Sequence, residues 1–366
     1  IRAIYVDHQL QSISNEWGAF VQQQCQQLNI PCIIQPVHVA SGNLESQARQ
    51  SRYQAYLQHL QPDEILVLAH HQQDQAETLM LRLLSGAGID GLAAMKAIDI
   101  RTDLTIWRPL LDISREQICQ WAADLNIQNI EDPTNQDTHY DRAWARQVLW
   151  PVLSHRYPKM QSALARTSEL MQDAQNILQD VLEQDLKLCG NAEILDLPSF
   201  SSLSKARQRQ LLSVWMKGEG QYRPSLNMVE RVQVEVIEAK PDAQAALHWS
   251  GYYYVRYQQQ LHRLKAEIYL TDQQLNVAEQ QIILQNKDQV HLPSGQFGIQ
   301  RAEIGLSPTL LGQPLYLRQR KGGEKIHLYG RVGHWPLKKA IQEAQIFPWT
   351  RHTIQILSTD NVMLGV

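Results

Sequence analysis

Two histidines and two carboxylates fall close together in the segment from His70 to Glu77. They follow a short apolar run, Ile65–Ala69, which is typical of a strand buried on both faces of a parallel sheet. Open α/β sheets bind their ligands at the carboxyl ends of strands, where His70 and His71 lie. Asp74 and Glu77 are three residues apart, so they share one face of the helix that begins there. The spacing predicts a site whose chemistry comes from imidazole and carboxylate groups.

The same residues also have a structural interpretation. Asp74 with Glu77 three residues later resembles a capping box, which satisfies free amides at a helix start. Two histidines at a strand end can be ordinary hydrogen-bonded residues. Spacing alone leaves both interpretations open. Under either one the helix is expected to bury its leucines, Leu79, Leu81, Leu83 and Leu84.

The segment resembles a family motif. Residues 69–78, AHHQQDQAET, with three spaced glycines after them, are similar to the second motif of tRNA(Ile)-lysidine synthases. These enzymes are phosphate-loop ATP pyrophosphatases. The family has two successive aspartates, of which the first is replaced here by Gln73 and the second matches Asp74. The resemblance implies that Asp74 contacts Mg²⁺ or lysine, with His71 and Glu77 as further catalytic residues.

A second motif lies in residues 130–146. Polar turn residues lead into Tyr140-x-Arg142-Ala143-x-x-Arg146, which resembles the family's Tyr-x-Arg-Asn-x-x-Arg with Ala143 in place of Asn. By composition alone this is a polar loop followed by an arginine-bearing helix. Arg142 and Arg146 share one helical face, which suits contact with RNA phosphates. Two motifs in the family's order argue against a chance match.

Three more positions are implied to bind ATP or lysine. His8 lies at the end of the first strand, in a segment that resembles the family's Asp-His-Gly-Leu. Arg49 lies in a helix similar to one of the family, and Arg108 opens the family's Arg-Pro-Leu-Leu. Both arginines have structural alternatives, since Arg49 could pair with Glu45 on the surface and Arg108 could pair with the nearby Asp112.

The elements that must position these residues alternate between strand and helix. Residues 1–6 and 31–36 are apolar enough for strands, and residues 11–28 form a helix between them. This β–α–β order predicts an α/β fold with a doubly wound parallel sheet. The resemblance specifies it as adenine nucleotide α-hydrolase-like. Gln9 stands where the family has glycine.

The chain of 366 residues is long enough for several domains. We expect an ATP pyrophosphatase catalytic domain over 1–155, a mainly helical tRNA- and substrate-binding domain over 156–268, and a small α/β tRNA-binding domain over 285–366. Residues 1–150 carry 10 Lys and Arg against 17 Asp and Glu, whereas residues 315–352 carry 8 against 2. This balance fits a catalytic body with a polyanion-binding end, although a solvated charged surface would show it too. The basic residues of the last domain that are implied to bind tRNA are Arg318, Arg320, Lys338, Lys339 and Arg351.

The cysteine pattern and the hydropathy of the sequence indicate the cellular compartment of the protein. Four scattered cysteines form no CxxC pair and no zinc spacing. The sequence has no secretory signal and no apolar run of about 18 residues. We therefore expect a cytoplasmic protein with reduced thiols and no membrane association.

The resemblance implies a reaction and its participants. ATP adenylates O2 of the wobble cytidine of an isoleucine tRNA with a CAU anticodon, and the amine of L-lysine then displaces AMP to form lysidine at C2. ATP and Mg²⁺ are the expected cofactors, tRNA and lysine are the expected partners, and a homodimer is left open. The alternatives are a noncatalytic tRNA-binding relative and another ATP-dependent tRNA-modifying enzyme of the superfamily. Thiolating relatives use cysteine pairs, which this chain does not supply.

The family's nucleotide loop, Ser-Gly-Gly-x-Asp-Ser, does not occur in the 366 residues. The chain opens in what corresponds to the family's second strand. We therefore expect the first strand and the loop to lie upstream of Ile1, and the chain from Ile1 to Val366 to lack ATP turnover by itself. A sheet without that strand would leave its two neighbours with unpaired edges.

Overall fold

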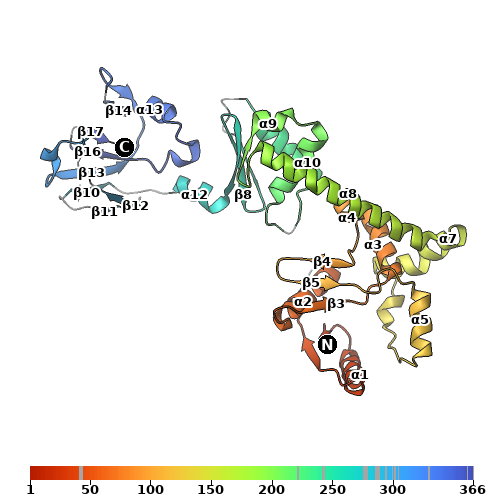
Figure 1. Ribbon diagram of the computed structural model, residues 1–366. Coiled ribbons are helices and arrows are strands. Elements are labelled where there is room, and N and C mark those ends of the chain that lie inside the picture. The colour runs from red at the N-terminus through yellow and green to blue at the C-terminus, as the bar shows by residue number, and fades with distance from the viewer. Residues whose placement is uncertain are drawn as a thin grey trace. The chain divides into compact units, whose positions relative to one another are not determined.

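The computed structural model contains two compact units, Ile1–Gln179 and Asp180–Val366. The boundary falls inside α8 (Met160–Cys189), the long helix of Figure 1. None of the helices in the described part of the chain combines the length and the apolar character that a membrane span requires. The structure describes all residues except 41–43, 221, 241–242, 244, 275–278, 285–288, 293–294, 299, 301, 304, 329, 361 and 366.

The first unit alternates strands and helices, as predicted. Its strands are β1 (Ala3–Asp7), β2 (Cys32–Pro36), β3 (Ile65–Val67), β4 (Ile98–Ile100) and β5 (Thr105–Trp107). Its helices before α8 are α1 (Ser14–Gln27), α2 (Leu44–His59), α3 (Gln72–Leu84), α4 (Ile89–Leu92), α5 (Arg115–Asp124), η1 (Pro133–Gln136), α6 (Asp141–Trp144), η2 (Ala145–Leu149) and α7 (Trp150–Arg156). The pairs β1·β2 and β3·β5 are parallel, which confirms the predicted parallel α/β arrangement, and β4 joins β5 antiparallel.

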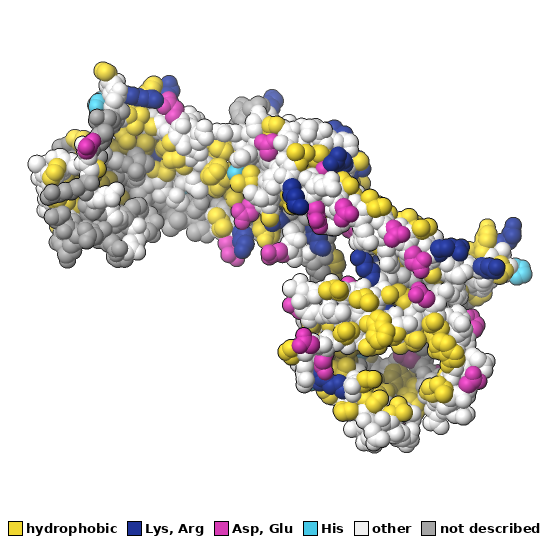
Figure 2. All heavy atoms as spheres, in the orientation of Figure 1, with side chains coloured by type: hydrophobic (Ala, Val, Ile, Leu, Met, Phe, Trp, Pro, Cys, Tyr) yellow, Lys and Arg dark blue, Asp and Glu magenta, His cyan; other side chains and the backbone are white. Residues whose placement is uncertain are grey.

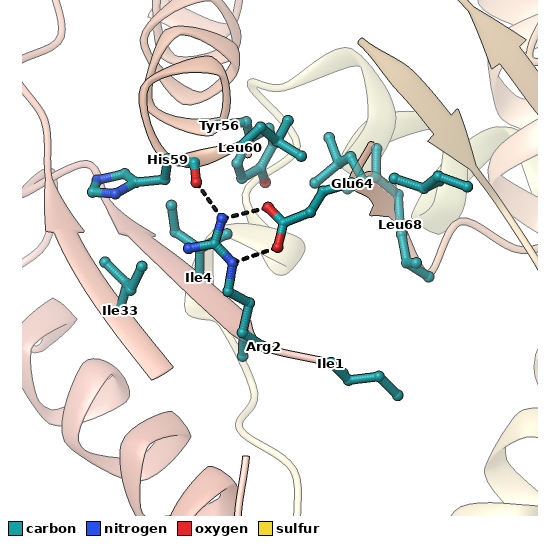
Figure 3. Close-up of a pocket in the computed structure, with 13 residues that line it drawn as sticks. Ile1, Arg2, Ile4, Ile33, Tyr56, His59, Leu60, Glu64 and Leu68 are labelled. Atoms are coloured by element: carbon teal, nitrogen blue, oxygen red, sulfur yellow. Dashed lines mark hydrogen bonds and ion pairs between the residues drawn. The ribbon is translucent and has the colours of Figure 1, made fainter. Parts of the chain in front are cut away.

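The strands of this unit form two separate sheets, β1-β2 and β3-β5-β4. A cavity of about 490 Å³ lies between β1 and β3. Figure 3 shows the guanidinium of Arg2, which donates from Nε to Oε1 of Glu64 over 2.8 Å and from Nη2 to the backbone oxygen of His59. The hydrogen bond from Arg2 is the main reason that the pKa of Glu64 falls to about 2. The expected unpaired edges of β1 and β3 are therefore present in the described part of the chain.

Strand β3 is shorter and more exposed than predicted. The prediction was a strand over Ile65–Ala69 with both faces buried. Leu66 is buried against Ile106, but Ile65 and Val67 are each 54% exposed and line the cavity. One face of β3 is therefore covered and the other is not. Hydrophobic side chains are prominent on the surface of this unit in Figure 2.

Helix α3 buries a polar face, so the predicted burial of its leucines is only partly correct. Leu79 is buried, whereas Leu83 and Leu84 are exposed. The buried face instead carries polar side chains, of which Gln75 donates to Met95 O over 2.7 Å and to Ser168 Oγ on α8 over 3.1 Å. Buried polar groups persist where each finds a partner. Helix α3 is thus held by polar contacts as well as by apolar packing, in which Ala76 clusters with Trp150 and Met160.

The second unit begins with helices on an antiparallel sheet of order β6-β9-β8-β7. Strands β8 and β9 form a hairpin, and β6 and β7 extend it into a four-stranded sheet within this mainly helical region. Its strands are β6 (Ile194–Asp196), β7 (Ala246–Trp249), β8 (Tyr252–Tyr257) and β9 (Gln260–Lys265). Its helices after α8 are α9 (Leu197–Ser202), α10 (Lys205–Lys217), α11 (Leu226–Arg231), η3 (Val232–Ile237) and α12 (Ala266–Gln274).

The remainder of the second unit contains the antiparallel sheet β10-β13-β16-β17. The predicted start of this domain, residue 285, lies outside the described residues. Its strands are β10 (Gln280–Ile283), β11 (Gln289–Leu292), β12 (Gly295–Gly298), β13 (Pro314–Gln319), β14 (Lys325–Ile326), β15 (Trp335–Pro336), β16 (Gln355–Ser358) and β17 (Met363–Gly365). Its helices are η4 (Pro308–Leu310), α13 (Leu337–Glu343) and η5 (Pro348–Thr350).

An aromatic cluster joins β9 to η5 within the second unit. The ring of His262 lies 5.1 Å from that of Phe347 and 5.0 Å from that of Trp349, centroid to centroid. Tyr257 packs edge-on against the same two side chains. His262 is buried, and burial lowers its pKa to about 4.

We expect the stability of the second unit to fall between pH 7.5 and pH 5 because of His262. Its pKa is about 4 in the folded chain, against an ordinary value of 6.5, so the unfolded chain binds the proton first as pH falls. The loss should be about 2 kcal/mol over this window. His262→Phe should remove that part of the pH dependence in urea unfolding. Identical pH dependence in the two proteins would contradict a neutral buried imidazole.

Candidate active site

A pocket of about 620 Å³ lies beside the carboxyl end of β1 and the start of α3. Residues from three separate predicted segments line it: His8 after β1, His70 and Asp74 around the start of α3, and Arg142 and Arg146 from α6 and η2. Both β1 and β3 pair in parallel with a neighbouring strand, and the residues that follow their carboxyl ends, His8 and His70, meet in this pocket.

Asp74 is held by the protein through both carboxylate oxygens. Oδ2 accepts from the backbone N of His71 over 3.0 Å, and Oδ1 accepts from Nη2 of Arg146 over 3.1 Å. One half of a capping box is therefore present, in which Asp74, the third helical residue, caps the backbone N–H of the N-cap residue His71. The expected capping box, with Asp74 as the N-cap and Glu77 as its partner, was placed three residues too late in the chain. Capping and a role in the pocket are compatible, because Asp74 also lines the pocket.

Glu77 has no exposed surface, so a direct catalytic contact predicted for it does not fit this structure. Arg146 grips it with two hydrogen bonds, Nε to Oε1 over 2.6 Å and Nη2 to Oε2 over 2.9 Å. Gln73 Nε2 also donates to Oε1 over 2.9 Å. The amide of Gln73 thus donates to a buried carboxylate, at the position where the family has aspartate. Glu77 positions Arg146, which in turn positions Asp74.

Arg146 was predicted to contact tRNA phosphates, but its donors point into the protein. It sits on η2, a π-helical turn, and such turns are frequent at functional sites. Its guanidinium bridges Asp74 and Glu77, which belong to α3. Arg142, one turn earlier, lines the same pocket. Both arginines therefore line the pocket.

Three histidines of the first unit carry a buried ring nitrogen that has no hydrogen-bond partner in the described part of the chain. These are the Nδ1 atoms of His8, His70 and His71. Burial lowers the pKa of His70 to about 4, and burial followed by the charge of Arg52 lowers the pKa of His8. His70 is therefore neutral at pH 7. Unpaired buried polar atoms need an explanation, and a ligand in the pocket that His8 and His70 line would supply one.

The sequence reasoning missed two acidic residues of the pocket, Asp7 and Asp132. Asp7 is buried at the end of β1, and its Oδ1 accepts from the backbone N of Gln9 over 2.9 Å. The signal was available, because Asp7 directly precedes His8 at the carboxyl end of a predicted strand. Gln9 has a φ of 54°, a left-handed conformation that favours glycine, which explains the glycine of the family motif.

Neither Arg49 nor Arg108 lines the pocket, although both were implied to bind ATP or lysine. Arg108 is buried and donates from Nη1 to Lys96 O over 2.7 Å, so its alternative pairing with Asp112 is not what the structure shows. Arg49 lies over the ring of Tyr53, with its guanidinium carbon 4.8 Å from the centroid. The side chain of Glu45, its alternative partner, lies outside the described residues.

The basic residues predicted to bind tRNA in the second unit fall in different environments. Lys338 and Lys339 are exposed on α13. Arg351 donates from Nε to Ile346 O over 2.9 Å, so part of its donor set serves the fold. Arg318 and Arg320 lie on either side of Gln319, at the end of β13.

The described residues contain no cluster of three acidic, histidine or cysteine side chains that could enclose a metal. A magnesium ion that binds together with a nucleotide needs only one or two carboxylates, because phosphates and water complete its shell. Each oxygen of Asp74 keeps a second lone pair beside its protein hydrogen bond. Asp74 therefore fits such an ion as a single ligand and does not form a metal cage.

Comparisons with known proteins found matches over most of the chain. A PP-loop domain model matches residues 1–153, a TilS substrate binding domain model matches 195–262, and a TilS substrate C-terminal domain model matches 315–366. The tRNA(Ile)-lysidine synthase of Acinetobacter baylyi is 60% identical over 366 residues, which cover 100% of this chain and 80% of that protein. The tRNA(Ile)-lysidine synthase of Escherichia coli O157:H7 is 34% identical over 361 residues, which cover 98% and 82%. A solved structure, the U34-tRNA thiolase NcsA from Methanococcus maripaludis, has a TM-score of 0.38 at 16% identity over 46% of this chain and 60% of that one. The identity and the coverage of the lysidine synthases show that the chain belongs to the tRNA(Ile)-lysidine synthase family.

Proposed function

We propose that this protein ligates L-lysine to C2 of the wobble cytidine of isoleucine tRNA with a CAU anticodon, at the expense of ATP and through an adenylated tRNA. Family membership over the whole chain supports the reaction. The observation that carries the site is the meeting of His8, His70, Asp74 and the two arginines of the second motif in one pocket. The product is lysidine, and ATP ends as AMP and diphosphate.

We assign the orientation of the lysine amine to Asp74. Its carboxylate is fixed by Arg146 and by the amide of His71, so its direction is set before substrate arrives. Holding a reacting group in place lowers the entropic part of the barrier. The neutral ring of His70 offers a hydrogen-bonding nitrogen without adding positive charge beside Arg142. Mg²⁺ would be held by the ATP phosphates with Asp74 as its protein ligand, and His71 remains a further catalytic candidate.

We assign tRNA binding to both units. Arg142 lines the pocket and can meet a phosphate next to the reacting cytidine. Lys338 and Lys339 extend the contact in the second unit. We retain the division into domains over 1–155, 156–268 and 285–366 for these roles. A cytoplasmic location follows from the tRNA substrate. The protein is either a monomer or a homodimer, and light scattering would distinguish the two.

The test is AMP release and lysine incorporation by the purified protein. We expect both to require ATP, lysine and isoleucine tRNA with the CAU anticodon together. Methionine tRNA has the same anticodon and is the matched control, which should give neither. Binding of the tRNA without AMP release would favour a noncatalytic relative. AMP release that does not depend on lysine would favour a different modification of the tRNA.

A further inference from the structure

In the loop after β13, the carboxylate of Glu324 lies close to several hydrogen-bond donors and positively charged groups. Oε1 of Glu324 accepts from the backbone N of Lys321 over 2.5 Å, and its two oxygens accept from the backbone N of Gly322 over 3.0 and 2.9 Å. Its oxygens also lie 3.6 Å from Nη1 of Arg318 and 3.9 Å from Nε of Arg320. The side chain of Glu324 is only 8% exposed. Two amides and two guanidinium groups therefore converge on one carboxylate.

The backbone of this loop is shaped to hold an anion. Consecutive amide groups that point the same way form a concave anion site, and here the chain's own carboxylate fills it. Gly322 and Gly323 have φ values of 92° and 84°, which only glycine adopts readily. Burial opposes ionisation of Glu324, but hydrogen bonds from backbone amides and the charge of Arg318 outweigh it and lower its pKa. The carboxylate is therefore ionised and fixed.

The two arginines keep donors for another partner. Arg318 and Arg320 are alternate residues of an extended segment, so their side chains lie on the same side. Their distances to Glu324 exceed a hydrogen bond, although they are short enough for a strong ionic attraction. Each guanidinium has five N–H donors, and two such groups repel each other unless a negative charge lies between them. Glu324 supplies that charge.

We propose that Glu324 is a positioning residue for tRNA binding, which holds Arg318 and Arg320 together as a pair that contacts the RNA phosphate backbone. The inference rests on the proposed function, and it adds a residue whose charge has the same sign as that of the RNA. Charge counting alone gives the opposite expectation. If only charge mattered, a carboxylate beside bound RNA would weaken the complex, and its removal would tighten it.

The decisive comparison is Glu324→Gln against Glu343→Gln. Glu343 pairs with Arg331 over 2.9 Å in the same part of the chain, and its side chain is 50% exposed. Both substitutions remove one negative charge. In the full chain, Glu324→Gln should weaken binding of isoleucine tRNA by about 10-fold and lower the salt slope by about 1 to 2, because phosphate contacts are lost. Glu343→Gln should leave the affinity unchanged or slightly tighter.

The same substitution in a protein that lacks both arginines distinguishes a positioning role of Glu324 from a loss of local structure. In an Arg318→Gln/Arg320→Gln protein, Glu324→Gln should have no further effect on tRNA affinity, because the pair it positions is gone. A further loss of similar size there would overturn the proposal, as would equal or tighter binding by Glu324→Gln alone. Absence of tRNA binding by the unaltered protein would overturn the proposed function and this inference with it. Unchanged binding by Glu324→Gln in a protein that binds tRNA would overturn this inference alone.

Discussion

Asp74→Asn should lower the rate of lysine transfer by about 10²- to 10³-fold, the usual effect of removing one preorganised charge from an active site. Asparagine has a single acceptor oxygen, whereas Asp74 uses both of its oxygens. If the amide keeps the cap to His71, its NH₂ group must face the guanidinium of Arg146. The loss of that charged hydrogen bond should lower the stability of the first unit by about 1 to 2 kcal/mol. The rate should thus fall far more than the stability does.

The measurement is single-turnover lysine transfer at saturating tRNA, together with urea unfolding. Asp63→Asn is the matched control. Asp63 is exposed, and its φ of 68° suits asparagine, so neither rate nor stability should change. A normal single-turnover rate in Asp74→Asn would remove Asp74 from the catalytic assignment.

Arg146→Met should destabilise the first unit by about 3 to 5 kcal/mol, since it leaves the carboxylate of Glu77 buried without its partner. Glu77→Leu should cost less, because Arg146 is partly exposed and keeps its contact with Asp74. The double variant Glu77→Leu/Arg146→Met should recover most of the stability, as a buried ion pair replaced by apolar side chains often does. Activity should not recover, because Asp74 would lack its guanidinium partner.

Hydrogen exchange of the α3 amides reports the stability of this region without interference from the second unit. Protection should be lost in Arg146→Met and largely return in the double variant. Full protection in Arg146→Met would contradict the cost of the unpaired Glu77. Full activity in the double variant would contradict the positioning role of the pair.

Much of the fold could be predicted because it depends on local patterns. Short apolar runs, helix-length polar segments and their alternation place β1, α1 and β2 within a few residues. The capping box that Ser114 and Gln117 form depends in the same way on a local pattern of residues. The limits of β3 were less predictable, since its burial depends on what lies beside it and not on its own composition.

The chemistry of the site was only partly predictable from sequence. Residue types and spacing identified Asp74 and Arg146, but not that they touch, because their contact spans 72 positions of the chain. Helical spacing could not show that α3 buries its polar side, since Gln75 and Glu77 find partners on other elements. Asp7 directly follows the predicted strand over residues 1–6, but only His8 of that strand end was chosen as a candidate.

The guanidinium of Arg146 determines how the position of Asp74 responds to a change of pH. A guanidinium stays protonated at any pH at which proteins remain folded, so the anchor of Asp74 does not switch off. A histidine or a lysine at this position could lose its proton within the pH range of the folded protein, and the geometry of the carboxylate would then depend on pH. With arginine, the direction of Asp74 is constant, and a rise of the rate with pH would report deprotonation of the incoming lysine amine rather than assembly of the site.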